Sequence, residues 1–352
     1  MYLSPLHQPA RPRAAALPVR IEGTGAYRPR VSLSSDQIDA RLGWPRGRTA
    51  GRFQIDSRGV AGADETTSFM AAEAGRAALA AAGIAADEVD LVLAACGVAE
   101  QPIPATAVLV HARLGLAGSG IPAYDIGATC LSFIAALDHA ALKIAAGQAR
   151  RVLVVAADIA SAGLDWSRPE GAAIFGDGAA AAVLGHAGAP DAPAAGDGSA
   201  LLAMRFETWS EGRDACVLAA GGTRINPSRP GGIAPEDATF QMDGATAFRI
   251  SRRRLPRFLR GLLDAAGITR DRIDAVIPHQ ASAQALEHAR DLLGFRHEQM
   301  VDIFADHGNQ IAASLPSALH HAIASGRLRR GQVALLLGTS AGISLGSAVL
   351  RF

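Results

Sequence analysis

Three residues suited to nucleophilic chemistry stand where apolar, strand-like runs give way to helix-like ones. Cys130 lies in DIGATCLSF, His279 follows DAVIP, and Asn309 lies in DHGNQIAASLP. A cysteine at a helix start meets unpaired backbone N–H groups and the positive end of the helix dipole, which favour the thiolate and make the sulfur a better nucleophile. Taken singly, each residue also has a structural interpretation: a small buried hydrophobe, a satisfied histidine and a helix cap.

The other cysteines have simpler interpretations. Cys96 ends an apolar run and Cys216 lies in ACVLAA, so we expect both to be packing residues. The three cysteines make an odd number without C-x-x-C spacing, which indicates neither a disulfide framework nor a zinc site. We therefore expect no metal centre, and a reducing compartment, the cytoplasm, as the location.

The chain repeats itself. Residues 82–92 read AGIAADEVDLV and residues 266–276 read AGITRDRIDAV. RVLVVAAD and QVALLLGT form a second pair, GAAAAVL and GSAVL a third, in the same order and at similar spacing. This order predicts two halves built on one plan. Asn309 then lies near the place in the second half that Cys130 holds in the first, and a pseudo-twofold axis would bring the two helix starts together.

Each half predicts alternating layers of helix and buried strand. VDLVLAAC and IDAVIPH are apolar on both faces, as expected for strands that helices cover on both sides. Amphipathic helices are predicted from about residue 67 to 82 and from about 253 to 266, and Gly83 and Gly267 are predicted to end them. The predicted fold class is therefore α/β.

The predicted organisation has three parts. Residues 1–18 are expected to form a flexible arm. An N-terminal half over 19–190 carries the cysteine, and a C-terminal half over 191–352 carries the histidine and asparagine. The Pro/Gly-rich stretch AGAPDAPAAGDGSA marks the boundary between the halves.

Composition excludes several function classes. The chain is 49% hydrophobic and 19% charged, which is enough apolar material for a large core. Its formal net charge of +1 provides no general attraction to nucleic acid. No apolar run approaches the roughly 20 residues of a membrane span. We therefore expect neither nucleic acid nor membrane as a partner.

The motifs taken together resemble a known family. DIGATCLSF, IFGDGAAAAVL, IPHQAS, DHGNQIAASLP and the C-terminal GTSAGISLGSAVLRF are similar, in this order, to condensing enzymes of the thiolase superfamily, of the β-ketoacyl-acyl-carrier-protein synthase III type. The resemblance runs from about Ile21 to Phe352. It implies a duplicated, five-layered αβαβα fold and a homodimer.

The resemblance also implies a mechanism without metal or cofactor. Cys130 would take an acyl group from a thioester, acyl-CoA or an acyl carrier protein. His279 and Asn309 would bind the carbonyl oxygen of a malonyl thioester and stabilise the enolate formed as carbon dioxide leaves. Backbone N–H groups of Cys130 and Ala341 would form the oxyanion hole of a decarboxylative Claisen condensation.

Donor-binding residues are carried over from the same resemblance. Phe53 corresponds to a tryptophan that stacks on the adenine of coenzyme A, and Arg58 lies one residue from the place of the family's arginine. Ser282 and Gln284 replace residues of an Asn-x-Arg motif that contacts the pantetheine and the carrier. We expect these four residues to bind coenzyme A or the carrier protein.

A basic helix face and an acyl pocket are also predicted. The run FRISRRRLPRFLRG places Arg249, Arg253 and Arg257 at four-residue spacing, on one face of a helix. This face is predicted either to be a solvated surface or to dock an acidic carrier protein. Ile103 and Phe175 are expected in the acyl pocket, and Ile103 is expected to reach it across the dimer.

Alternatives remain open at this stage. Some proteins of this type pass the acyl group to an alcohol or amine, and a non-catalytic partner subunit would only shape an acyl tunnel. Head-to-head condensing enzymes of the superfamily carry a glutamate base where this chain has Ile103. A papain-like hydrolase uses the same three residue types, but the duplicated buried-sheet plan argues against it.

Overall fold

The computed structural model describes residues 16–189 and 198–352, and the side chains of residues 169 and 170 are not described. The arm predicted over residues 1–18 lies almost entirely outside these ranges, as does the predicted boundary between residues 190 and 191. Five described strands between residues 19 and 186 form one large sheet, four between 200 and 351 form another, and two short strand pairs lie apart from both.

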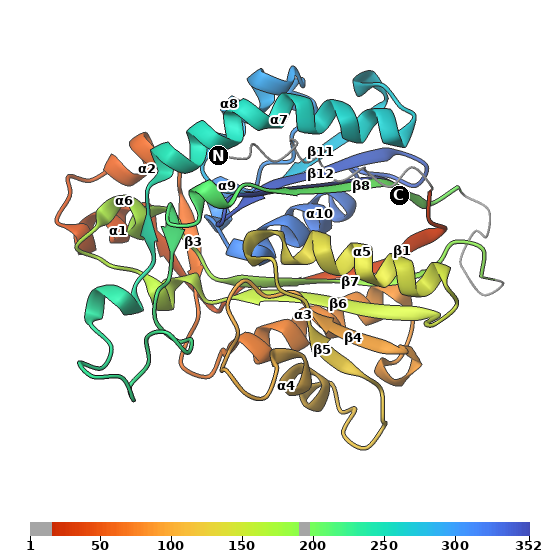
Figure 1. Ribbon diagram of the computed structural model, residues 1–352, viewed down its shortest axis with the longest axis horizontal. Helices are drawn as coiled ribbons and strands as arrows, with labels where there is room; N and C mark the ends of the chain where they lie inside the picture. Colours follow the sequence, from red (N-terminus) through yellow and green to blue (C-terminus); the bar gives the residue numbers. More distant parts are fainter. Residues whose placement is uncertain (1–15, 190–197) are drawn as a thin grey trace, which may run out of the picture.

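The first large sheet has the strand order β1-β7-β6-β4-β5 (Figure 1). Its strands are β1 (Val19–Tyr27), β4 (Leu91–Ala94), β5 (Ala123–Asp125), β6 (Arg151–Asp158) and β7 (Gly178–His186). β4 runs parallel to β5 and β6, whereas β7 runs antiparallel to β1 and β6. β4, β6 and β7 are buried almost throughout, because helices cover both faces of the sheet.

The second large sheet has the order β11-β12-β13-β8. Its strands are β8 (Ala200–Thr208), β11 (Ala275–Pro278), β12 (Val333–Ser340) and β13 (Ser344–Arg351). β6 starts at residue 151 and β12 at 333, while β1 starts at 19 and β8 at 200, so nearly the same length of chain separates each equivalent pair. The repeat read in the sequence is thus a repeat of strands.

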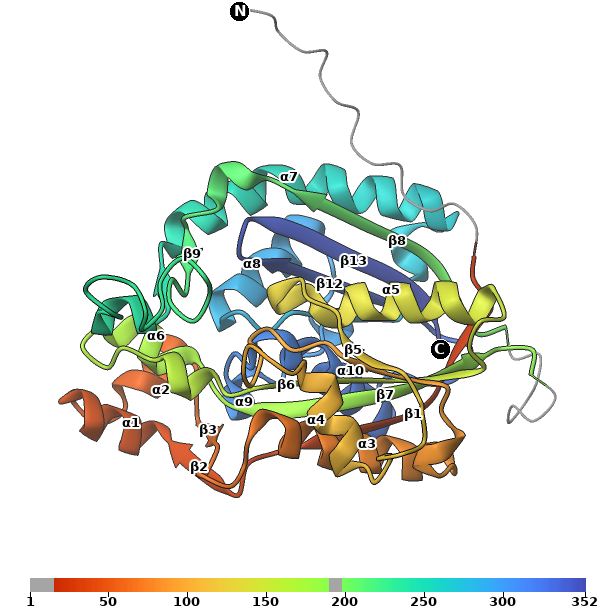
Figure 2. The same ribbon diagram turned by 60° about the horizontal axis from the view of Figure 1, so that its bottom comes forward.

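Helices lie outside both sheets and between them. The main helices are α3 (Thr67–Ala82), α4 (Thr106–Arg113), α5 (Ser132–Ala145), α7 (Gly244–Ala266), α8 (Ala283–Leu293) and α10 (Ser314–Ala324). Figures 1 and 2 show α3 and α4 outside the first sheet, α7 and α8 outside the second, and α5 and α10 between the sheets. This order of layers confirms the predicted αβαβα fold.

The helix ends show where the sequence interpretation was accurate. Gly83 and Gly267 end α3 and α7 in the left-handed conformation, with φ of 71° and 66°, as predicted. α7 begins at Gly244, well before the predicted start near Arg253. The Asp243 side chain caps it by accepting the N–H of Thr246 at 3.0 Å.

Shorter elements complete the described chain. They are α1 (Ser35–Leu42), α2 (Arg48–Phe53), α6 (Pro169–Ile174), α9 (Phe304–His307), β2 (Val31–Ser34), β3 (Ser57–Val60), β9 (Cys216–Val217) and β10 (Gln241–Met242). β2 pairs with β3 and β9 with β10, both antiparallel. Two 3-10 turns, η2 (Thr129–Leu131) and η8 (Ile311–Ala313), run directly into α5 and α10.

The central helix layer joins the two halves in one core. Leu137 of α5 and Leu319 of α10 belong to the same buried cluster as Val154 of β6 and Leu336 of β12. Burying such side chains contributes about 1.5–3 kcal/mol each to the free energy of folding. The starts of α5 and α10 are therefore held in place by a shared apolar core.

Candidate active site

The two helix starts share an unusual backbone. Thr129 opens η2 with φ of 49°, and Ile311 opens η8, at the equivalent place of the second half, with φ of 51°. A branched residue in the left-handed region is strained, and such strain persists only where the surroundings enforce it. η2 packs against both η8 and β12. The fold therefore places Cys130 beside the turn that follows Asn309.

Cys130 lies, partly exposed, in the turn that opens α5, as predicted. Ser132 fixes this turn, because its hydroxyl accepts the N–H of Ala128 at 2.9 Å and donates to the carbonyl of Thr129 at 2.7 Å. The sulfur is thus carried by a backbone that its own neighbours hold rigid.

The surroundings of Cys130 act on the pKa of its thiol in two directions. Burial, followed by the nearby Asp158 and Cys216, raises the pKa of the thiol to about 12. Hydrogen bonds from the backbone N–H groups of Cys130 and Ala341 lower it, but by less. The backbone N–H groups therefore favour the thiolate, as expected, but they do not offset desolvation and a nearby carboxyl group, so the thiol is protonated at rest.

His279 directly follows β11 at the same edge of the second sheet. Its N–H donates to the carbonyl of Leu337 on β12 at 2.8 Å, and its side chain is only 7% exposed. Burial lowers the pKa of the imidazole to about 4, so the ring is neutral at pH 7. Within the described residues, its Nδ1 has no hydrogen-bond partner.

Gly338 shows how close the cysteine and histidine segments lie. A Cβ at this position of β12 would stand 2.7 Å from Cδ2 of Leu131 and 3.1 Å from Cβ of His279. The residue after Cys130 and the catalytic candidate His279 therefore press against the same point of β12. Any side chain at residue 338 would push them apart.

Asn309 completes the group of three. Its Nδ2 donates to the carbonyl of Ala281 at 3.3 Å, and its Oδ1 accepts the N–H of Ile311 at 2.9 Å. The N–H of Ala281 in turn donates to the carbonyl of His279 at 2.9 Å. The asparagine and histidine segments are therefore tied together, with the carboxamide nitrogen turned toward the histidine loop.

Asp158 is a residue of the site that the sequence interpretation missed. Its fully buried carboxyl group ends β6 and accepts the N–H groups of Gly97, Val98 and Ala312 at 2.9, 3.0 and 2.9 Å. Burial raises its pKa to about 7 although these donors favour the charged form. A single acid at the end of the apolar run RVLVVAAD was the signal that could have identified it.

The predicted donor-binding residues fall in different environments. Phe53 stacks on Trp44, with ring centroids 5.8 Å apart. Arg58 corrects the prediction, because it is 1% exposed and donates inward to the carbonyl of Ala172. Burial lowers its pKa to about 10. In this structure the Arg58 guanidinium therefore cannot contact a donor at the surface.

Ser282 and Gln284 lie at the start of α8. The Ser282 hydroxyl accepts the N–H of Ala285 at 3.1 Å and so caps the helix, a structural use that the sequence analysis did not assign. Gln284 is exposed. Their part in donor binding stays a prediction.

The two predicted acyl-pocket residues differ in exposure. Phe175 is 5% exposed, packs edge-on against Phe240 at 5.2 Å, and pairs through its backbone with Asn309. Ile103 is 85% exposed in the described chain. A role for Ile103 in the pocket would need a second copy of the chain and stays a prediction.

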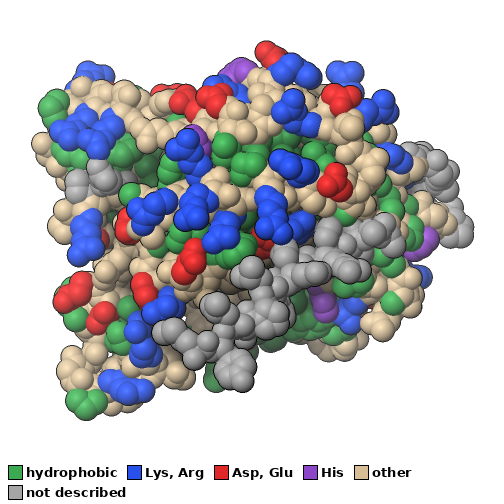
Figure 3. All heavy atoms as spheres, turned by 45° about the horizontal axis from the view of Figure 1, so that its top comes forward, with side chains coloured by type: hydrophobic (Ala, Val, Ile, Leu, Met, Phe, Trp, Pro, Cys, Tyr) green, Lys and Arg blue, Asp and Glu red, His purple; other side chains and the backbone are tan. Residues whose placement is uncertain are grey.

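The arginines of α7 form an exposed face. Arg249, Arg253 and Arg257 all lie on the outer side of this helix. Figure 3 looks onto this side of the molecule, where Lys and Arg side chains gather. We call these three residues the α7 arginine face. Arg254 is not part of it, since it packs over Trp209 at 3.7 Å and pairs with Glu211.

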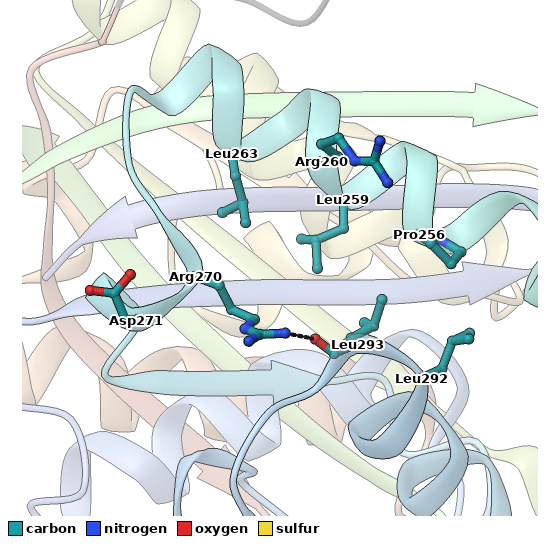
Figure 4. A pocket seen from close by; sticks show the side chains of 8 residues that line it. All are labelled: Pro256, Leu259, Arg260, Leu263, Arg270, Asp271, Leu292 and Leu293. Atoms are coloured by element: carbon teal, nitrogen blue, oxygen red, sulfur yellow. Dashed lines mark hydrogen bonds between the residues drawn. The ribbon is translucent and has the colours of Figure 1, made fainter.

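A groove of about 410 Å³ lies between α7 and α8 (Figure 4). It is lined by Pro256, Leu259, Arg260, Leu263, Arg270, Asp271, Leu292 and Leu293. Arg270 spans it by donating to the carbonyl of Leu293 at 2.9 Å. None of the three candidate catalytic residues lines this groove, so it is separate from the site.

Over 16–189 and 198–352, no helix is both long and apolar enough to cross a membrane. The same ranges contain no cluster of three His, Cys, Asp or Glu side chains arranged to hold a metal ion.

Known sequences place this architecture in one family. Residues 124–199 match the family described as 3-oxoacyl-(acyl-carrier-protein) synthase III, and residues 263–352 match its C-terminal part. A β-ketoacyl-(acyl-carrier-protein) synthase III of Neisseria meningitidis is 34% identical over 340 residues, 95% of this chain and 99% of the relative. The synthase of Granulibacter bethesdensis is 36% identical over 94% of this chain and 98% of its own.

Solved structures of similar proteins have the same fold as this chain. The 3-oxoacyl-(acyl-carrier-protein) synthase III of Aquifex aeolicus superposes with a TM-score of 0.83 at 30% identity, over 95% of this chain and all of that one. The enzyme of Pseudomonas aeruginosa superposes with a TM-score of 0.81 at 33% identity, covering 95% and 98%. OleA of Xanthomonas campestris, at 22% identity and a TM-score of 0.81, shares the fold.

Proposed function

The chain belongs to the 3-oxoacyl-(acyl-carrier-protein) synthase III family, and from this premise we propose how its active site works. The enzyme is an acyltransferase that joins an acyl thioester to a malonyl thioester and forms a β-ketoacyl product. The observation that supports the assignment of residues is the convergence of Cys130, His279 and Asn309 at the adjoining ends of two related half-folds.

The first half-reaction loads the acyl group. The Cys130 sulfur attacks the thioester carbonyl, the bond to the donor sulfur breaks, and the thiol proton passes to the departing thiol. A thiol with a pKa of about 12 is uncharged at rest, so its proton must move as the sulfur attacks. The neutral His279 ring is the base that we assign to this transfer.

The second half-reaction extends the acyl group. The malonyl carbonyl oxygen accepts hydrogen bonds from His279 and from Nδ2 of Asn309, which become stronger as carbon dioxide leaves and an enolate forms. The enolate carbon attacks the acyl-cysteine, and the backbone N–H groups of Cys130 and Ala341 receive the oxyanion. The carbon–sulfur bond then breaks, the Cys130 sulfur leaves as a thiolate, and a proton taken up from solvent restores the thiol.

We infer an acidic acyl carrier protein as a partner. The α7 arginine face is exposed and basic, and acidic carriers would be attracted to it. A homodimer is the proposed assembly, supported by the 85% exposure of Ile103. The cytoplasm is the proposed location, supported by three free cysteines.

Intact-protein mass spectrometry tests this function. After incubation with a panel of acyl-CoA and acyl-carrier thioesters, the wild type should gain the mass of one acyl group, whereas Cys130→Ala should gain none. Malonyl thioester should then release carbon dioxide and remove the added mass. Acylation without malonyl-dependent release, but with transfer to an alcohol or amine, would reject the condensation in favour of the alternative acyl transfer.

A further inference from the structure

A second cavity lies beside the Asn309 loop, and Cys130 is not among the residues that line it. Its volume is about 160 Å³, and residues from the end of β1, from β7, from α9 and from α10 line it. The polar groups on its wall are Tyr27, Arg28, His307, Gln310, Ser317, His320 and His321. None of its lining residues is an aspartate or glutamate. The proposed mechanism uses none of these side chains.

The basic groups of this cavity lie close to one another. Burial lowers the pKa of both His307 and His320. The charge of Arg28 lowers the pKa of His307 further, and His321 lowers the pKa of both. Such crowding of positive charge disfavours protonation unless an anion offsets it. Asp306 acts in the opposite direction on His307, and the nearby Glu65 is engaged by the hydroxyl of Tyr27 at 2.6 Å.

Existing hydrogen bonds leave the cavity short of negative charge. Nη2 of Arg28 donates to the hydroxyl oxygens of Ser32 and Ser57 and to the carbonyl of Asp306, which are all neutral acceptors. Among the described residues no carboxylate pairs with Arg28. His307 uses Nδ1 toward the carbonyl of Ile303 at 3.1 Å, so its other ring nitrogen is the one left for a ligand.

We propose that this cavity binds a small oxyanion of the phosphate class, held by Arg28, His307, His320 and His321 with the hydroxyl of Ser317. Its donors come from three elements and therefore surround a compact ligand, which suits a tetrahedral oxyanion. The volume admits free phosphate or the phosphate of a small monoester and excludes a nucleotide.

Binding here acts on the Asn309 loop. His307 and Gln310 stand on either side of Gly308 and Asn309, and Gln310 is anchored by donating to the carbonyl of Asp177 at 3.1 Å. Gly308 lies against the chain at Ile174, where a Cβ would approach the carbonyl oxygen to 2.7 Å. An anion that holds His307 therefore restrains the loop that positions the carboxamide.

Calorimetric titration with inorganic phosphate tests the site. The wild type should bind about tenfold more tightly at pH 6 than at pH 8, because His307 and His320, whose pKa values are lowered in the free protein, must take up protons to face an anion. His321→Glu changes an exposed residue, so the protein should fold normally, yet its affinity at pH 6 should fall about tenfold or more because a negative charge then faces the ligand. His320→Gln should weaken binding in the same direction.

A matched control and a second readout complete the test. His297→Gln changes an exposed histidine outside the cavity and should bind phosphate as the wild type does. Phosphate should slow amide hydrogen exchange in peptides that contain Asn309 in the wild type and not in His321→Glu. Methyl phosphate and inorganic phosphate are compared to separate the monoester from the free ion. Equal phosphate affinity in all these proteins, or no binding to the wild type at pH 6, would overturn the proposal irrespective of whether Cys130 is acylated.

Discussion

The lowered pKa of the His279 imidazole predicts how the rate of malonyl decarboxylation depends on pH. An ordinary histidine titrates near 6.5, but burial lowers the pKa of this one to about 4. A ring that must be neutral to serve its role therefore stays functional well below pH 6.5. Malonyl decarboxylation, measured in single turnovers as carbon dioxide release, should change little from pH 8 to pH 5.5 and decline only as the pH approaches 4.

The same shift has a consequence for stability. Because the folded-state pKa of His279 lies below its unfolded value, its contribution to stability is present above pH 6.5 and is lost as the pH falls toward 4. His279→Asn, which cannot protonate, should remove this contribution to acid unfolding and should reduce decarboxylation about 100-fold or more. A rate inflection at pH 6.5 in the wild type would contradict the assigned ring environment.

Gly338 offers a second residue-level prediction. In Gly338→Ala the new methyl group would meet Leu131 and His279 at 2.7 and 3.1 Å, so one of them must shift. Such overpacking costs about 1–3 kcal/mol of unfolding free energy. We expect both acylation and decarboxylation to slow at least about tenfold, since a misplacement of about 1 Å has a large effect on rate.

The control for this experiment is Gly163→Ala. Residue 163 has nothing within 4 Å of an added Cβ and an ordinary φ, so its substitution should leave both half-reactions unchanged. Denaturant unfolding and stopped-flow acylation of the two variants provide the comparison. If Gly338→Ala kept full activity, the tight contact between the cysteine and histidine segments would not contribute to activity.

At the residue scale, sequence reasoning was accurate for positions but did not determine charge states. Cys130, His279 and Asn309 do lie at adjoining helix starts and strand ends, because chain order and the repeat determine those places. The resting thiol of Cys130 and the inward guanidinium of Arg58 were not predictable in the same way. Both depend on burial by segments distant in sequence, which a local motif does not describe.

At the scale of elements, Asp158 connects segments that meet only in the folded protein. Its carboxyl oxygens accept N–H groups from the loop after β4 and from η8, which carries the turn beside Asn309. Asp158→Asn would place an amide nitrogen against one set of these donors, with an expected cost of about 1–3 kcal/mol. Decarboxylation should fall more than acylation, because η8 supports Asn309.

The pH dependence of this variant separates its role from general damage. Burial raises the pKa of Asp158 from 3.8 to about 7, so wild-type stability declines as the pH rises between these values. Asp158→Asn cannot ionise and should lack this decline when unfolding is followed at pH 4, 5.5 and 7. A variant whose stability changed with pH as the wild type does would refute the raised pKa.

The predicted elements were accurate where local signals end them. The sequence predicted the helix Thr67–Ala82 with its first and last residues and its terminal glycine, because Gly83 ends the helix in the left-handed conformation. α7 starts earlier than predicted, and it accommodates Pro256 in its interior, where a proline usually kinks or ends a helix. The cap by Asp243 is set by a single side chain and is easily missed in sequence.

Over the whole molecule, the repeat was the most informative feature of the sequence. Two half-folds whose equivalent strands recur at nearly constant spacing share one central layer, which no single motif specifies. The small-oxyanion cavity beside Asn309 was not predictable, since its walls come from the end of β1, from β7, from α9 and from α10. A site assembled from distant segments can be recognised only from the three-dimensional arrangement of those segments.

The α7 arginine face predicts how the whole enzyme binds its carrier protein. Reversing charge in Arg253→Glu together with Arg257→Glu should raise the apparent KM for carrier-linked substrate about tenfold at low salt, because long-range attraction to an acidic partner is lost. The KM for an acyl-pantetheine substrate without the carrier should not change.

Arg329→Glu, an exposed substitution outside α7, is the matched control. Added salt should reduce the difference between the variant and the wild type, since screening weakens attraction in the wild type. If carrier kinetics at low salt were the same in the variant and the wild type, the arginines of α7 would be a solvated face and the carrier would dock elsewhere.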